Sequence, residues 1–318
     1  MATNVTTAAE TNVITTQQMV RAREIDFVNR FTHGSLAKLI DALGVTRKIP
    51  MIDGTTLYNY KTTTVDFQTG VVPEGEIIPL SKYKREKVPV GEIVLKKWRK
   101  AATAEAILKS GYNEAVIQTD NKLLSDVQNG IRGDFFTYLG GIVVAAQAAS
   151  GTQGQEGYKP AVEAVGTTVT GATLQEVLAK SWGNLQVLFE DDSAELVHFV
   201  HPLTIADYLA DATITTQTAF GMTYIENFLG MGTVILNSRV TQNKVISTAK
   251  ENLIMYYVPV TSEAMGAFDM TADPLGYIGI KSGYPTEERA QIESLVMSGI
   301  QFLVEYADGV VQGTVTGA

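Results

Sequence analysis

Residue types that carry catalysis are sparse in this chain. It contains no cysteine, which excludes thiolate nucleophiles, zinc–thiolate sites and disulfides. His198 and His201 stand three residues apart at the end of an apolar run, without a third ligand at metal-binding spacing. We therefore predict a structural role for these two histidines and no metal site.

The acidic residues offer one further kind of chemistry. Adjacent carboxylates at Asp191–Asp192 and Glu287–Glu288 are the residue type that general acid–base hydrolysis requires. Such pairs more often form a solvated surface, so a soluble carboxylate hydrolase is the weakest alternative. The sequence also lacks a Walker A motif, a Gly-x-Gly-x-x-Gly after a strand and a Gly-x-Ser-x-Gly nucleophile elbow. We predict a protein that is not an enzyme, with no catalytic residues and no cofactor.

The charged residues are distributed unevenly along the chain. Segment 82–109 holds nine Lys or Arg and three acids, a charge of +6, while the whole chain carries −9 and the remainder therefore −15. Opposite charge on two parts of one surface steers copies of a protein toward each other. We predict that Lys82, Lys84, Arg85 and Lys87 face acidic residues of a neighbouring copy.

Nucleic acid is the alternative partner of this basic segment. Glu86 and Glu92 interrupt it, and Tyr83 is a nearby aromatic residue without an aromatic series behind it. Single-stranded nucleic acid is usually held by several stacking side chains along a basic groove. The net charge of −9 also argues against a protein whose main task is to bind nucleic acid.

A long hairpin must position these basic residues. Thr55–Phe67 is rich in Thr, Tyr and Val and predicts a strand, Gln68–Lys87 contains two glycines and two prolines and predicts a loop, and Val88–Trp98 predicts the return strand. Pro89 lacks the N–H that a ladder needs, so the return strand is expected at an edge or locally unpaired. Strands of this length make an arm of about 40 Å, which cannot bury both of its faces within its own domain.

Apolar periodicity predicts the helices. Gln17–Leu43 has helical composition and ends at Gly44, a residue typical of a helix C-terminus. Tyr112–Leu139 keeps apolar residues three or four apart over a length of roughly 40 Å, and Gly130 and Gly133 are expected to bend its middle.

Shorter segments complete an α+β prediction. Thr173–Glu176 fits a capping box that begins another helix. Residues 1–16 are polar and predict an extended arm, and residues 150–157 predict a flexible loop. Further strands are expected at Leu196–Val200, Thr233–Leu236, Val245–Ser247, Leu253–Val258, Ile292–Val304 and Val310–Val315, and short helices at Ala104–Ser110, His201–Ala210 and Tyr224–Leu229.

Composition indicates a globular chain. With 45% hydrophobic and 19% charged residues, its 318 residues suffice for one large or two ordinary domains. The most apolar stretch, Ile142–Ala149, is too short to span a bilayer. The N-terminus has no basic region followed by an apolar run, so we expect a soluble protein made in a cytoplasm, without a membrane partner.

Read in order, these segments resemble the major capsid protein of tailed bacteriophages with the Hong Kong 97 fold. The hairpin Thr55–Lys100 is similar to the extended loop of that family, and Tyr112–Leu139 is similar to its spine helix. Phe199–Leu203 followed by Ile205–Leu209 resembles the strand-Pro-helix step of the family's axial domain. Val234–Val240 ahead of Ala249–Leu253 resembles the paired strands of that domain. Gln301–Val311 resembles the stretch that closes the peripheral sheet.

The resemblance implies a domain organisation. It gives an N-terminal arm and helix at 1–49, an extended β-hairpin loop at 50–103, a peripheral domain with the spine helix at 104–171, an axial domain at 172–282 and a return to the peripheral domain at 283–318. The lysines of the hairpin cannot be matched to the cross-linking lysine of some family members. Fewer than twenty polar residues precede the first helix, so a separate scaffolding protein is expected.

The function implied by the resemblance is a shell. Hexamers and pentamers of one chain would enclose double-stranded DNA without sequence-specific binding, in a virion assembled in the bacterial cytoplasm. A portal protein and decoration proteins are the further partners that the resemblance implies. An encapsulin, a bacterial shell of the same fold around a protein cargo, stays open as the alternative.

Overall fold

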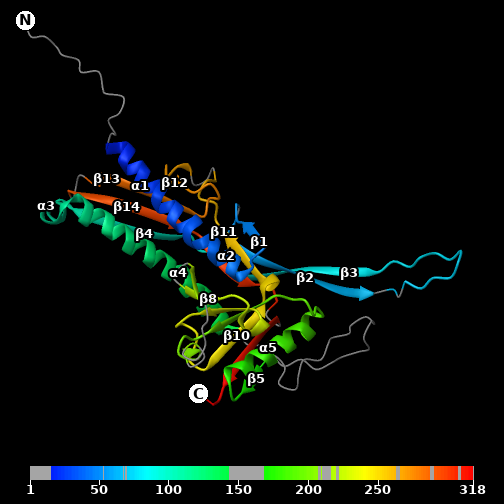
Figure 1. Ribbon diagram of the computed structural model, residues 1–318. Helices are drawn as coiled ribbons and strands as arrows, with labels where there is room; N and C mark the ends of the chain where they lie inside the picture. Colours follow the sequence, from blue (N-terminus) through cyan, green and yellow to red (C-terminus); the bar gives the residue numbers. More distant parts are fainter. Residues whose placement is uncertain are drawn as a thin grey trace, which may run out of the picture.

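The computed structural model describes residues 16–52, 54–66, 68, 70–142, 168–206, 209, 216–219, 222–262, 266–286, 290–306 and 309–317. Figure 1 shows an elongated upper part, a lower part that contains the C-terminus, and a two-stranded arm that leads away from both. The polar N-terminal residues 1–15, the loop 150–157 and Glu287–Glu288 lie outside the described residues, so their predictions stay predictions.

Four sheets and five α-helices make up the described part of the chain, which confirms the mixed helix-and-sheet prediction. The helices are α1 (Thr16–Phe31), α2 (Ala37–Leu43), α3 (Ala104–Tyr112), α4 (Thr119–Gly141) and α5 (Leu174–Phe189), with π turns η1 (Thr32–Leu36) and η2 (Asn113–Gln118) and 3-10 turns η3 (Phe228–Gly230) and η4 (Lys250–Asn252). The seven-stranded sheet has the spatial order β5 (Thr168–Gly171), β16 (Val310–Val315), β10 (Lys244–Ala249), β6 (Leu196–Val200), β9 (Thr233–Leu236), β8 (Met222–Ile225) and β7 (Gln217–Ala219). The four-stranded sheet has the order β12 (Thr271–Ala272), β13 (Ile278–Thr286), β14 (Gln291–Ser298) and β4 (Lys96–Thr103). The three-stranded sheet consists of β1 (Arg47–Pro50), β11 (Leu253–Tyr257) and β15 (Ile300–Val304), and the two-stranded sheet of β2 (Thr56–Asp66) and β3 (Lys82–Glu92).

Both long helical predictions are confirmed, each with a π turn inside the helical run. The first consists of α1, η1 and α2 and ends at Gly44, whose φ of 65° is left-handed and suits glycine. In the second, α4 continues through Gly130 and Gly133 without a break. These two glycines leave space for neighbours, because a Cβ at Gly130 would lie 3.4 Å from the Trp98 ring and one at Gly133 would lie 3.1 Å from Arg239.

An aromatic cluster joins α4 to two of the sheets. Phe135 lies with its ring centroid 5.6 Å from those of Phe199 on β6 and Phe302 on β15, in edge-on arrangements. Phe136 contacts Phe199 at 5.5 Å in the same way. Edge-to-face contacts add to the area that these rings bury, so α4 holds the upper and lower parts of the molecule on one core.

Buried charges fix α1 against the sheet below it. Asp120 on α4 is 2% exposed, and its carboxylate contacts Arg23 of α1 at 3.3 Å and Lys100 of β4 at 2.5 Å. Glu24, also buried, accepts hydrogen bonds from Thr271 Oγ1 at 2.6 Å and from the Ser282 amide at 2.5 Å. These contacts tie one helix to α4, β4, β12 and β13 at once.

The seven-stranded sheet packs against α5 in the lower part of the molecule (Figure 1). The predicted start of α5 is confirmed with one half of the capping box, because the Glu176 carboxylate bonds the amide of Ala172, one residue before the N-cap Thr173. Thr173 Oγ1 accepts from the Glu176 amide at 3.2 Å, and Glu176 Oε2 accepts from the Ala172 amide at 2.8 Å. The carboxylate satisfies an amide at a helix start, where negative charge is also favourable.

We expect Thr173→Ala to lower the free energy of unfolding by about 1 kcal/mol, because the Glu176 amide loses its acceptor. Urea denaturation followed by circular dichroism measures the change. Thr173→Ser retains the hydroxyl and is the matched control, with an expected change below about 0.5 kcal/mol. Equal stability of the alanine and serine variants would contradict this role for the cap.

Three sequence predictions in this region are wrong. Tyr224–Leu229 is not an α-helix. Tyr224 lies in strand β8, where it pairs with Ile235, and Asn227 and Leu229 have left-handed φ values of 47° and 53°. Val234–Val240 and Ala249–Leu253 are not paired strands, because β9 pairs with β6 and β8 and residues 250–252 form η4. The stretch Ile292–Val304 is two strands in different sheets, β14 and β15.

The C-terminal residues are likewise divided between sheets. Strand β15 pairs with β11, whereas β16 pairs with β10 and β5 in the seven-stranded sheet. The resemblance implies that residues 301–311 close one sheet, but the structure divides them between two sheets. Of the helix predicted at His201–Ala210, the structure describes one helical hydrogen bond, from the Leu209 amide to the Ile205 oxygen at 3.1 Å.

No helix among the described residues is long and apolar enough to cross a membrane.

Candidate assembly site on the projecting arm

The predicted hairpin is present as an arm, residues 55–92, built on β2 and β3. Within the described residues these two strands pair only with each other. Eleven residues in each strand correspond to a length of about 35 Å. Figure 1 shows the arm leading away from the body, so most of its surface faces away from its own chain.

The base of the arm is anchored in the body. Leu57 and Ile93 are buried in a small cluster with Ile254 and Leu303. Tyr256 donates a hydrogen bond from its hydroxyl to the Tyr58 backbone oxygen at 2.8 Å. Apolar burial and a hydrogen bond thus hold the first residues of β2 and the end of β3, and they fix the direction in which the arm points.

The irregular pairing expected at Pro89 is observed. Leu57 pairs with Gly91 and Tyr58 pairs with Pro89, so Val90 has no partner across the ladder. Proline cannot donate a ladder hydrogen bond and is confined to edges and bulges, which explains the shift in register.

The predicted limits of the loop and the return strand are wrong. Strand β3 begins at Lys82, so the loop ends before Lys82 and is shorter than the predicted Gln68–Lys87. The glycines and prolines that predict a loop all precede Lys82, which leaves residues 82–87 able to form a strand. The return strand ends at Glu92, and Lys96–Thr103 forms β4, which pairs with β14 in the body. Half of the predicted basic segment therefore lies outside the arm.

Three of the four basic residues of β4 have acidic partners in the body. Lys96 pairs with Asp134, Arg99 with Glu293, and Lys100 with Asp120. Without them the arm, residues 55–92, contains five basic and five acidic residues and carries no net charge. The prediction of a strongly basic arm is corrected to a neutral arm with one basic strip.

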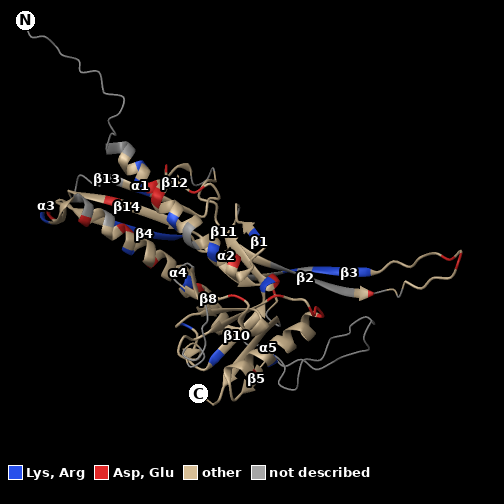
Figure 2. Cartoon of the chain, viewed as in Figure 1, with Lys and Arg blue, Asp and Glu red and all other residues tan. Residues whose placement is uncertain are grey.

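The four predicted contact residues, Lys82, Lys84, Arg85 and Lys87, form this basic strip on β3. All four are exposed, and with Glu86 between them residues 82–87 carry +3. Figure 2 shows the strip in blue along the arm. Lys87 also stacks its ammonium over the ring of Tyr58, 3.6 Å from the centroid, which holds this side chain against β2.

The tip beyond the strip is acidic and tightly turned. The Glu76 amide donates to the Pro73 oxygen at 3.2 Å, and Gly75 has a φ of 89° between them, a conformation that favours glycine. Glu74 and Glu76 thus occupy the outermost turn, red in Figure 2. The predicted loop Gln68–Lys87 includes the four cations, whereas the structure places them on strand β3, behind the tip.

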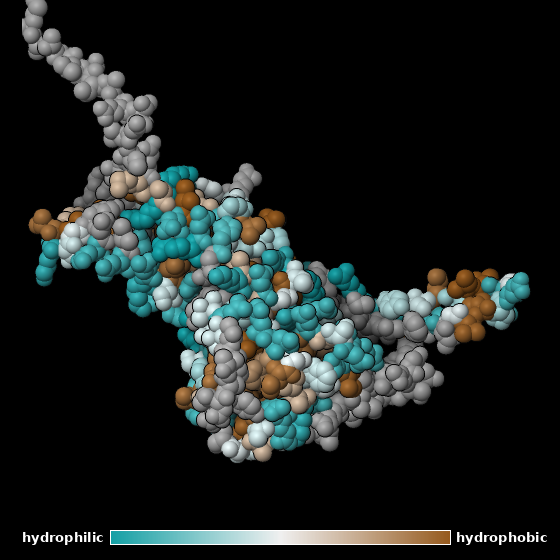
Figure 3. Space-filling model, in the orientation of Figure 1, coloured by the Kyte–Doolittle hydropathy of each residue, from teal (hydrophilic) through white to brown (hydrophobic). Residues whose placement is uncertain are grey.

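The most prominent surface feature that sequence reasoning missed lies on the same loop. Figure 3 shows brown, apolar side chains close to the tip of the arm. They belong to Val71, Ile77, Ile78 and Leu80. A signal was present in the sequence, because large apolar residues stood in a segment whose glycines and prolines exclude a core strand.

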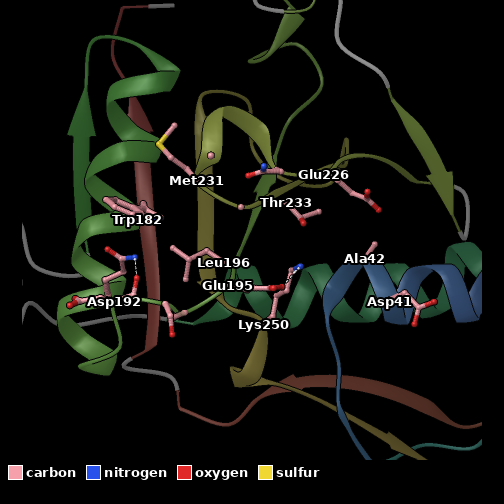
Figure 4. A pocket seen from close by; sticks show the side chains of 16 residues that line it. Asp41, Ala42, Trp182, Asp192, Glu195, Leu196, Glu226, Met231, Thr233 and Lys250 are labelled. Atoms are coloured by element: carbon pink, nitrogen blue, oxygen red, sulfur yellow. Dashed lines mark hydrogen bonds and ion pairs between the residues drawn. The ribbon is translucent and has the colours of Figure 1, made fainter.

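The body contains a pocket of about 470 Å³ that is lined by several carboxylates (Figure 4). The pocket is lined by Trp182 and by four acidic residues, Asp41, Asp192, Glu195 and Glu226. Lys250 is the one basic residue of the lining, and its ammonium lies 2.9 Å from the Glu195 carboxylate. Its lining residues include no histidine. Ser193 instead donates its hydroxyl to Asp191 at 2.7 Å, an arrangement typical of a turn.

Two carboxyl groups near this pocket, those of Asp191 and Glu195, have pKa values shifted in the opposite direction from that of a general acid. Hydrogen bonds from Ser193 lower the pKa of Asp191, and the hydrogen bond from Lys250 lowers the pKa of Glu195. A general acid at neutral pH requires a pKa shifted upward. The acid pair Asp191–Asp192 thus behaves as a solvated turn, which weighs against the hydrolase alternative.

His198 has a structural role, as predicted. It is fully buried, with Nδ1 2.7 Å from Ser247 Oγ and Nε2 2.9 Å from the Met231 oxygen. The carbonyl can only accept, so Nε2 carries the proton and the Ser247 hydroxyl donates to Nδ1. Burial lowers the pKa of His198 to about 4, so the ring is neutral near pH 7.

Comparison with known proteins identifies the fold but no sequence family. No protein-family model matches the chain, and no curated protein sequence matches it. The capsid structure of the cyanophage P-SCSP1u aligns over 88% of this chain and 88% of its own, with a TM-score of 0.50 and 8% identity. A Gordonia phage Cozz chain (88% of this chain and 87% of its own, TM-score 0.48, 13% identity) and a virus-like particle from Pyrococcus furiosus (93% and 97%, TM-score 0.47, 15% identity) align less closely. The first alignment shows that the chain shares the fold of a phage capsid chain.

Proposed function

We propose that the protein is the major capsid protein of a tailed phage, which assembles through its own copies into an icosahedral head shell around double-stranded DNA. The observation that supports this most is the arm, a two-stranded extension anchored at its base, on a body with the fold of a phage capsid chain. Such an extension gains stability only when another molecule covers it.

The energetics of a shell suit the contacts available on the arm. One exposed ion pair contributes only about 0–1 kcal/mol. In a closed shell each copy contacts several neighbours, so weak contacts act together and single errors remain reversible. The basic strip then faces acidic residues of the neighbouring body, which carries the whole net charge of −9 because the arm is neutral.

The finer assignments belong to the same proposal. The arm serves as the extended loop of the Hong Kong 97 architecture and α4 as its spine helix, with the domain limits given above. Hexamers and pentamers form the shell in the bacterial cytoplasm. A separate scaffolding protein, a portal protein and decoration proteins are the proposed partners.

Electron microscopy of the purified protein, with nuclease treatment of its contents, tests the function. Closed icosahedral particles that contain, or can package, double-stranded DNA are the expected result. Particles that hold a protein cargo and no DNA would assign an encapsulin-like shell instead. A chain that stays monomeric at high concentration would contradict both shells.

We expect reversal of the basic strip, with Lys82, Lys84, Arg85 and Lys87 all changed to Glu, to slow association about tenfold or more at roughly 10 mM salt. The change turns a neutral arm into one of charge −8 facing an acidic body. At roughly 0.5 M salt the rate should recover, because charges are screened within a few ångströms. Time-resolved light scattering measures both rates.

The control variant makes the same change of charge on the body. Four exposed cations of the body, Arg21, Lys38, Lys48 and Lys109, are all changed to Glu. If the two variants associate at the same rate at low salt, net charge rather than the basic strip governs association.

A further inference from the structure

The tip of the arm exposes an apolar cluster that its own chain does not cover. The exposed fractions are 85% for Val71, 95% for Ile77, 75% for Ile78 and 82% for Leu80. We call these four residues the tip cluster. Figure 3 shows it as brown side chains near the end of the arm, next to the teal residues of the outermost turn.

Isolated apolar residues on a protein surface are normal, but this arrangement differs from scattered exposure. Four large aliphatic side chains lie within ten residues, on a loop where polar residues are the rule. The turn at Pro73–Glu76 reverses the chain between Val71 and Ile77, so residues on both sides of it contribute to the cluster. Exposed apolar surface of this kind marks a contact site.

The chain cannot cover this cluster by folding back on itself in the observed structure. Leu57 and Ile93 fix the base of the arm in the body, and the β2–β3 ladder extends from there. The tip thus lies about 35 Å from its anchor, a distance set by the eleven residues in each strand.

We infer that the tip cluster is the adhesive part of the arm and packs against a second copy of this chain, while the basic strip orients the approach. The inference rests on the proposed self-assembly and names the contact that carries its affinity. Because the arm has no net charge, electrostatic attraction by itself gives it little adhesion. Burial of the aliphatic side chains of the tip cluster supplies the binding free energy that the basic strip does not.

A second copy is the occupant that the charges favour. The basic strip of charge +3 follows the tip cluster directly along the chain, at the start of β3, so a partner that contacts the tip must also lie close to the strip. The body of this same chain carries −9 and suits that position.

The geometry also predicts how copies connect. Each copy offers one tip and receives another elsewhere on its surface, so the contact is head-to-tail and closes into rings or larger assemblies rather than two-fold dimers. One tip buries far less area than a stable isolated pair needs. The contact therefore becomes effective only when several copies close together.

The test replaces apolar side chains at the tip without changing charge. The variant Ile77→Ser, Ile78→Ser, Leu80→Ser is expected to raise the concentration needed for assembly about thirtyfold or more, as light scattering measures. Its melting temperature as an unassembled chain should match that of the wild type, because these side chains contact no core. The rescue variant, with valine at the same three positions, should assemble close to the wild-type concentration.

A matched control removes apolar residues that are also exposed but lie on the body. Ile52→Ser, Leu108→Ser and Leu275→Ser change positions that are 66%, 90% and 51% exposed. This control is expected to assemble within about threefold of the wild-type concentration. Assembly of the wild type should also persist at roughly 0.5 M salt, because apolar contacts are not screened.

Each outcome separates this inference from the proposed function. Assembly of the tip variant at the wild-type concentration would overturn the inference and leave the shell intact. A wild-type chain that never assembles would remove the proposed function itself. If that monomeric chain bound phosphatidylcholine vesicles through its tip, a lipid surface would be the occupant and the inference would be overturned.

Discussion

Asp120→Asn is expected to lower the free energy of unfolding by about 3–5 kcal/mol. The carboxylate is buried between Arg23 on α1 and Lys100 on β4, at 3.3 and 2.5 Å. Asparagine has nearly the same shape but no charge, so Arg23 and Lys100 would both lose the carboxylate that they share. Removal of one member of a buried pair leaves an uncompensated charge, which costs far more than a lost surface contact.

The protonation of Lys100 reports the same change. Burial lowers the pKa of Lys100, and the hydrogen bond from its ammonium to Asp120 opposes that effect. Without the carboxylate we expect the pKa to fall further. Urea denaturation of the unassembled chain measures the stability.

Asp126→Asn is the matched control for this prediction. Asp126 lies on the same helix and pairs with Lys122 one turn away, at 2.7 Å, with both side chains largely exposed. Exposed pairs of this spacing contribute about 0.3–0.5 kcal/mol. A loss below about 1 kcal/mol for Asp120→Asn, comparable to the control, would refute the role of Asp120 as a buried tie between α1, α4 and β4.

Acidification from pH 7 to pH 4 is expected to destabilise the chain by about 3 kcal/mol through His198 alone. Its pKa is about 4 in the folded chain and 6.5 in a model peptide. Below pH 6.5 the unfolded chain therefore binds a proton that the folded chain refuses. This contribution to stability is complete above pH 6.5 and is lost progressively as the pH falls toward 4.

The measurement compares slopes, because carboxylates also affect stability in acid. The stability of the wild type and of His198→Gln is measured by urea denaturation at pH 7, 6, 5 and 4. The variant should be less stable at pH 7 but lose about 3 kcal/mol less on acidification. His201→Gln, three residues away, is the matched variant for the loss of a histidine side chain. Parallel curves for His198→Gln and the wild type would show that His198 does not titrate in this way.

Local patterns in the sequence were sufficient for the main helices. The apolar spacing of 112–139 specified a helix because a 3.6-residue period places those side chains on one face regardless of what covers them. Gly44 and the capping box at Thr173 specified helix ends through their own backbone and side-chain geometry. Such features depend on residues a few positions apart.

Pairing between distant segments was not specified in this way. Lys96–Thr103 continued the basic run of the hairpin in the sequence, but β14 supplies its ladder partner and Asp120, Asp134 and Glu293 supply its counter-charges. Strand β16 could belong to either of two sheets until its pairing with β10 and β5 was known. Nothing within these segments encodes which partner they meet.

The arm illustrates both sides of this division. The sequence by itself determined a hairpin with an irregular Pro89 in its return strand, because strand propensity and the missing proline N–H are local properties. Only the tertiary structure decided that the arm is neutral, that its cations lie behind the tip, and that Val71, Ile77, Ile78 and Leu80 have no cover. Exposure and net charge of a surface depend on which distant residues fold against it, and that is fixed by long-range packing.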